Sequence, residues 1–240
     1  MGFSSKYFYL TKKQATLKNL LTQKHIPLLG WSSSSPLNFR PEAKTLVLLV
    51  IGLILFGVGE TLLIAAGIGV SPWTVLAQGI SNITSLSIGE ASFFVSLLVI
   101  FLWIPLKQMP GIGTILNAII IAAVIEFSLP FLPYPEDSIY QILQTILGVL
   151  VVGIGSGIYL ISNLGAGPRD GLMTRLQRVT QLPISIVRTT LEIVVVIIGW
   201  SLGGVVGLGT VIFAIGIGPA VSMGLVTVER LSLVSKKIAS

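Results

Sequence analysis

The chain has 240 residues, of which 53% are hydrophobic and 10% are charged, and its mean hydropathy is +0.94. Soluble domains carry about 25% charged residues, so this composition excludes a globular protein in water. The sequence contains no cysteine and one histidine, His25. Disulfides are therefore excluded, and the usual thiolate and imidazole ligands for a metal inside a membrane are absent. We expect no metal site and no cofactor.

The net charge of +6 arises in residues 1–45, which hold seven of the fifteen Lys and Arg and one acid, Glu42. We interpret this region as a basic cytoplasmic tail, flexible around Ser32–Pro36. Basic residues next to a membrane are attracted to anionic lipid, so we expect such lipid as a partner. We expect no nucleic acid, because no folded basic face is evident.

Six apolar stretches follow in chain order, each long enough to span a bilayer as a helix or nearly so. They are residues 46–68, 88–106, 113–132, 139–161, 184–202 and 205–228. With the tail inside, six crossings place all fifteen Lys and Arg in inside segments, as the positive-inside rule requires. The sequence therefore predicts a multi-pass protein of the plasma (inner) membrane with both termini cytoplasmic, residues 229–240 forming a short C-terminal tail.

Two halves of the chain align without a gap when one is shifted by 96 residues. Gly52, Gly57 and Gly59 meet Gly148, Gly153 and Gly155, and the segment from Gly111 to Thr114 meets that from Gly207 to Thr210. We interpret residues 46–132 and 139–228 as two copies of one three-helix unit. Three crossings per copy is an odd number, so the copies should be inverted in the membrane, an architecture that suits alternating access. The expected fold is all-α, and a duplication that only stabilises the bundle is the alternative.

Several motifs resemble the YczE-like branch of the YczE/YyaS/YitT membrane proteins. They are Gly165-Ala166-Gly167-Pro168-Arg169-Asp170-Gly171-Leu172, then Arg188 and Glu192, Gly199-Trp200, Gly203-Gly204, and Gly207 to Thr210. The resemblance covers roughly residues 46–228. The first copy departs from it, because Thr74 stands where the family prefers an acid. The resemblance implies a bacterial inner-membrane protein and names no substrate.

Acids within the apolar stretches are candidate functional groups, because an ionised side chain inside a membrane usually faces a cavity or a partner. We select Glu60 and Glu126 for a proton- or cation-coupled site. The alternative for each is a protonated carboxyl bonded to a neighbouring helix. Arg188 and Glu192, one helical turn apart, form either part of a substrate path or a self-neutralising pair.

Two glycine–proline segments should break the helices, through Gly69 and Pro72 in the first copy and Gly165, Gly167 and Pro168 in the second. Helix ends at membrane depth can bind an anion, so we add Arg169 and Asp170 to the substrate path. In the alternative interpretation Asp170 is an N-cap and residues 169–181 form an amphipathic helix at the inner interface. The glycines of the long helices are interpreted as packing faces.

Enzyme motifs are absent: there is no H-E-x-x-H, no Cys nucleophile and no G-x-S-x-G, so we expect no enzyme. The sequence favours a small secondary transporter or exporter of an unknown small molecule or ion, with homo-oligomerisation possible. The alternative is a non-transporting membrane partner that recruits another protein through its tail.

Overall fold

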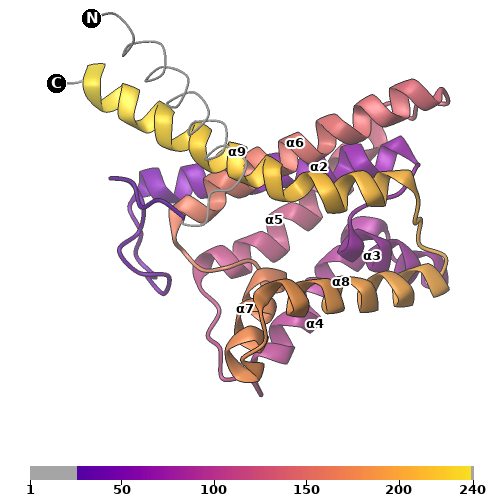
Figure 1. Ribbon diagram of the computed structural model, residues 1–240, viewed down its shortest axis with the longest axis horizontal. Coiled ribbons are helices and arrows are strands. Elements are labelled where there is room, and N and C mark those ends of the chain that lie inside the picture. The colour runs from indigo at the N-terminus through magenta and orange to yellow at the C-terminus, as the bar shows by residue number, and fades with distance from the viewer. Residues whose placement is uncertain (1–25, 239–240) are drawn as a thin grey trace, which may run out of the picture.

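The computed structural model describes residues 26–238 of the protein. This part of the chain forms eight α-helices, one 3-10 turn and no strand (Figure 1). The first half holds α2 (Ala43–Ala66), α3 (Pro72–Ile83), α4 (Ile88–Trp103), α5 (Ile112–Ser128) and the turn η1 (Leu129–Phe131). The second half holds α6 (Ser138–Ser162), α7 (Pro168–Thr180), α8 (Ile184–Ser201) and α9 (Leu208–Ile238). The predicted all-helical class is confirmed.

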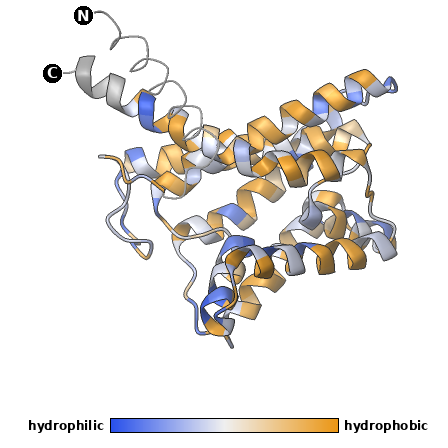
Figure 2. Ribbon diagram, in the orientation of Figure 1, coloured by the Kyte–Doolittle hydropathy of each residue, from blue (hydrophilic) through white to orange (hydrophobic). Residues whose placement is uncertain are grey.

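Five of these helices are long and apolar enough to cross a bilayer: α2, α5 with η1, α6, α8 and α9. Helices α3 and α4 meet at an angle of 117° and supply a sixth span when they are counted as one broken segment. Large apolar side chains such as Phe94, Phe127 and Ile197 are exposed on the outer surface, and apolar residues dominate most of the helices (Figure 2). This surface fits lipid and not water, and the count of six crossings stays a prediction.

Each half contains four helices and not the predicted three. The additional helix of the first half is α3, which begins with Pro72 at its first helical position, where proline costs no hydrogen bond. With 12 residues it is too short to span a membrane alone, and it carries polar side chains such as Gln78 and Asn82. Its counterpart α7 covers the segment for which the sequence predicts an amphipathic helix.

Helices α2, α6 and α9 pack together along one side of the molecule, with α3, α4, α7 and α8 on the other side and α5 between them (Figure 1). Glycines permit a close approach between α2 and α6. A Cβ added at Gly52 would lie 2.9 Å from the carbonyl oxygen of Gly155, and one added at Gly59 would lie 2.7 Å from that of Gly148. The interpretation of these glycines as a packing face is confirmed.

The two halves exchange equivalent contacts. The amide of Gly113, at the start of α5, donates to the carbonyl of Leu164 in the second half at 2.7 Å. The amide of Gly209, at the start of α9, donates to the carbonyl of Ile68 in the first half at 2.8 Å. Both the donors and the acceptors are 96 residues apart. The helices also recur at this spacing, because α3, α4 and α5 begin 96 residues before α7, α8 and α9.

The segment that precedes α2 is folded onto the bundle, which corrects the prediction of a flexible stretch at Ser32–Pro36. Trp31 is buried against Ile161 and Leu225. The amide of Ser33 donates to the carbonyl of Ser162 at 2.9 Å, and the side-chain amide of Asn163 donates to the carbonyl of Ser33. Most of the predicted basic tail, residues 1–25, lies outside the described residues.

Candidate functional site

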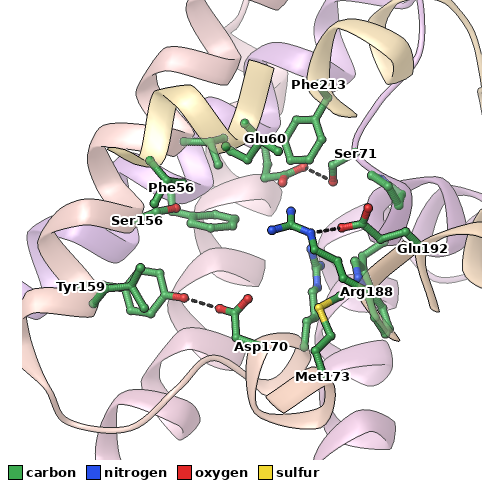
Figure 3. Close-up of a pocket in the computed structure, with 18 of the residues that line it drawn as sticks. Phe56, Glu60, Ser71, Ser156, Tyr159, Asp170, Met173, Arg188, Glu192 and Phe213 are labelled. Carbon is green, nitrogen blue, oxygen red and sulfur yellow. Dashed lines mark hydrogen bonds and ion pairs between the residues drawn. The ribbon is translucent and has the colours of Figure 1, made fainter. Parts of the chain in front are cut away.

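A cavity of about 560 Å³ lies between the two sides of the bundle (Figure 3). Residues of α2, α3, α6, α7, α8 and α9 line it, so both halves contribute. Five of the six charged residues that the sequence selects are in this lining: Glu60, Arg169, Asp170, Arg188 and Glu192. The helices therefore bring together groups that lie up to 132 positions apart in the chain.

Glu60 is the most deeply buried of these charged groups, with 1% of its surface exposed. Its Oε2 lies 2.8 Å from the hydroxyl of Ser71 and 2.8 Å from the hydroxyl of Thr74. Its Oε1 is buried and has no hydrogen-bond partner among the described residues. A buried acceptor without a partner costs about 1–3 kcal/mol, and more when it is charged, so this oxygen is suited to an external donor.

The position of Ser71 explains how the carboxylate is held. Ser71 is the N-cap residue of α3, but its side chain does not cap the helix. Its hydroxyl instead reaches Glu60 of α2, which places that carboxylate beside the N-terminus of α3. The two hydroxyls thus fix the orientation of the Glu60 side chain at the start of α3.

Arg188 and Glu192 form an ion pair one turn apart on α8, with Nε of Arg188 2.8 Å from Oε1 of Glu192. The pair uses only one of the guanidinium nitrogens. The two terminal nitrogens of Arg188 point into the cavity (Figure 3), and within residues 26–238 they bond to no protein group. Arg188 is thus both paired and available, so the two interpretations of the sequence do not exclude each other.

Arg169 and Asp170 occupy the first turn of α7. The guanidinium of Arg169 stacks over the ring of Trp73, 5.5 Å from its centroid. Burial lowers the pKa of Arg169, while the charges of Glu60 and Asp170 act to raise it. The carboxylate of Asp170 accepts a hydrogen bond from the hydroxyl of Tyr159 (Figure 3). Asp170 thus has a partner on α6 and makes no side-chain cap bond to its own helix.

Glu126 is not part of this cavity. It lies on α5, and its carboxylate accepts a hydrogen bond from Ser87, the N-cap residue of α4. The structure thus separates Glu126 from Glu60, although the sequence selects both for one coupled site.

The predicted helix breaks lie where α2 and α6 end. Gly69 and Gly165 have φ angles of +114° and +112°, which only glycine adopts readily. Pro72 and Pro168 are the first residues of α3 and α7, and Gly167 is the N-cap residue of α7. The breaks position Trp73 and Arg169, which are 96 residues apart and stack on each other.

Sequence reasoning missed several residues of the cavity. Tyr159, Trp73 and Ser71 give no signal of their own, because single aromatic and hydroxyl residues are ordinary in membrane helices. The spacing of 96 residues could have found Trp73, which stands opposite the selected Arg169.

A second, smaller cavity of about 60 Å³ lies beside the first and shares Phe56, Arg169 and Asp170 with it. Its other lining residues include Ser92, Ser96, Asn117 and Ile121, which stand 96 residues before Arg188, Glu192, Phe213 and Ile217 of the large cavity. The two spaces therefore have equivalent lining residues in the two halves. The wide one carries Arg188 and Glu192 where the narrow one carries Ser92 and Ser96. The hydroxyl of Ser92 is buried without a partner in the described chain.

The helices and their exposed apolar surface define an integral membrane protein with a polar cavity inside the bundle. Residues 43–224 match the family model described as "Family of unknown function (DUF6198)". The chain belongs to this family.

Three curated proteins are similar to the chain. An "Uncharacterized protein" of Haemophilus influenzae is 41% identical over 206 residues, which cover 86% of this chain and 94% of that protein. The "Uncharacterized membrane protein YczE" of Bacillus subtilis is 32% identical over 68% of this chain and 77% of its own length. The "Uncharacterized protein YyaS" of Bacillus subtilis is 24% identical over 68% of this chain and 83% of its own length. These relatives confirm the predicted resemblance. No solved structure matches the chain.

Proposed function

We propose that the protein is a small secondary transporter or exporter that carries a charged solute through the central cavity. One observation carries this proposal: five charged side chains from both halves line a single cavity in an otherwise apolar bundle. Charged groups are expensive inside a membrane and are found mainly where they line solute or ion pathways. A bundle selected only for stability would gain more from apolar side chains at these positions.

The equivalence of the two halves supports an alternating-access mechanism. The helix starts, the exchanged backbone hydrogen bonds and the two cavities all recur at a spacing of 96 residues. In an inverted repeat, the two halves exchange conformations during transport, so that one access route closes while the other opens. In this mechanism the present conformation is one end of the transport cycle. The wide cavity is the open access route, and its narrow equivalent is the closed one.

Within this mechanism Glu60 binds the coupling proton or cation. Its buried Oε1 has no partner, while Ser71 and Thr74 hold Oε2 in place. The equivalent residue in the second half is Ser156, which also lines the cavity. Only the first half therefore carries an acid at this position. Glu126 lies outside the cavity and has no role in this proposal.

The test is solute flux in proteoliposomes that contain the purified protein and a mixed pool of labelled metabolites. Wild-type protein should exchange at least one solute, and Glu60→Gln should lower that flux at least about tenfold, because a charge that drives binding is lost. Glu136→Gln is the matched control, since it removes an equally charged but exposed carboxylate in the loop before α6. Flux that is equal in the wild-type protein and Glu60→Gln would contradict the role of this cavity.

A further inference from the structure

The cavity leaves two complementary sets of binding groups without protein partners. Glu192 is paired with Nε of Arg188, and Asp170 is bonded by Tyr159. The groups that remain include the Oε1 of Glu60 as an acceptor and the terminal nitrogens of Arg188 as donors, with the indole N–H of Trp73 as a further buried donor. A guanidinium edge of this kind matches a carboxylate with two parallel hydrogen bonds.

The cavity wall also carries apolar side chains. Phe56 and Phe213 stand beside Glu60 in the cavity wall (Figure 3). Other apolar lining residues include Val152, Leu160, Met173, Ile217, Val221 and Leu225. The volume of about 560 Å³ is within the range of about 300–1,000 Å³ that is usual for small-ligand sites. The cavity therefore offers an acceptor for a cationic group, donors for an anionic group and apolar side chains beside them.

We infer that the transported solute is a small zwitterion with an apolar body, the chemistry of a free apolar α-amino acid. Its carboxylate binds the terminal nitrogens of Arg188, and its side chain contacts Phe56 and Phe213. Its ammonium group donates to Oε1 of Glu60 in exchange for the coupling proton or cation, so the solute and the coupling ion occupy this oxygen in turn. This inference rests on the proposed function, because it takes the cavity to be the solute site.

Ligands of a single charge satisfy only half of this site. A simple carboxylate leaves Oε1 of Glu60 buried without a donor, and a simple amine leaves the terminal nitrogens of Arg188 without an acceptor. An unsatisfied charged group inside a binding site is more costly than a missing apolar contact. A zwitterion satisfies both groups and adds no net charge to the membrane interior.

The test compares L-phenylalanine with 3-phenylpropionate, which lacks the amino group, and with 2-phenylethylamine, which lacks the carboxylate. Binding to the purified wild-type protein in nanodiscs is measured by calorimetry and by the rise in melting temperature. We expect L-phenylalanine to bind roughly tenfold or more tightly than either fragment, as the loss of one charged hydrogen bond requires. This comparison needs no variant, so it holds whether or not substitutions fold.

Two variants then assign the two ends of the ligand. Glu60→Gln should remove the advantage of L-phenylalanine over 3-phenylpropionate, and Arg188→Gln should remove its advantage over 2-phenylethylamine. Glu136→Gln should leave both ratios unchanged. Equal binding of L-phenylalanine and either fragment by the wild-type protein would overturn the inference, as would the absence of binding by all three.

Failure of this inference is distinguishable from failure of the proposed function. If no phenyl compound binds but another solute shows flux that depends on Glu60, the zwitterion assignment falls and the transporter stands. If flux is independent of Glu60 for every solute in the pool, both fall.

Discussion

Ser71 and Glu60 are joined by a hydrogen bond in which the N-cap residue of one helix serves the carboxylate of another. The Oγ of Ser71 lies 2.8 Å from Oε2 of Glu60, and the N-terminus of α3 has no side-chain cap. The start of α3 is therefore organised around the buried acid of α2.

Ser71→Ala should lower the stability of the protein. The change removes a donor to a buried carboxylate, which costs about 1.5–3 kcal/mol for a charged hydrogen bond. In a Glu60→Gln background the same change should cost about 0.5–1.5 kcal/mol, the value of a neutral bond. Thermal unfolding in detergent, run as a double-mutant cycle, measures the difference. Equal losses in the two backgrounds would show that Ser71 does not act through the charge of Glu60.

Gly52→Val should destabilise the crossing of α2 and α6. A Cβ at this position would meet the amide nitrogen of Tyr159 at 2.8 Å and the carbonyl oxygen of Gly155 at 2.9 Å, both of them backbone atoms. Overpacking of this kind costs about 1–3 kcal/mol or more. Gly218→Ala is the control, because a Cβ there meets nothing within 4 Å and alanine favours a helix. A melting temperature of Gly52→Val equal to that of wild type would contradict the close approach.

Gly69→Ala and Gly165→Ala should cause similar losses of stability, although the two residues lie in different halves. Both have φ angles above +110°, where a side chain is strained by about 1–3 kcal/mol. Each also lies against a threonine of the opposite half, Thr210 for Gly69 and Thr114 for Gly165. Thermal unfolding of the two variants checks this equivalence, and a large loss for only one of them would argue against it.

The sequence predicted most of the charged site because ionisable residues are rare in apolar segments. It could not separate Glu60 from Glu126, since an apolar helix gives no signal for which of its faces meets the bundle interior. Helix α3 was missed because its 12 residues mix Trp73 and Val75 with polar side chains and show no span. The docking of Trp31 could not be predicted, because its partners Ile161 and Leu225 lie more than 125 residues away in the chain.

Trp31→Ala should release the segment before α2 and lower the melting temperature. The side chain is 6% exposed and packs on α6 and α9, and truncation of a buried Trp costs about 3–5 kcal/mol. Hydrogen exchange should rise at Ser33, whose amide is bonded to Ser162. Unchanged exchange there would contradict a docked segment.

The alternative function, a non-transporting protein that recruits a partner through its basic tail, can be tested by truncation. The truncation must end before the docked segment that contains Trp31. Removal of residues 1–25 keeps Trp31 and its contacts, so a transporter should retain its flux. A protein that recruits a partner through its basic tail would instead lose that partner, which co-purification detects. A full-length protein that shows no flux and whose partner is lost in the 1–25 deletion would contradict the transporter interpretation.

The most direct test of the central claim is the accessibility of the two cavities, and the natural chain suits it because it has no cysteine. Ser222→Cys places a thiol in the wide cavity, and Ser92→Cys places one in its narrow equivalent. Without solute, a small water-soluble thiol reagent should modify position 222 quickly and position 92 slowly. During solute exchange in proteoliposomes, we predict that position 92 is modified faster, and position 222 more slowly, than without solute. Rates at both positions that do not respond to any exchanged solute would contradict alternating access through this cavity.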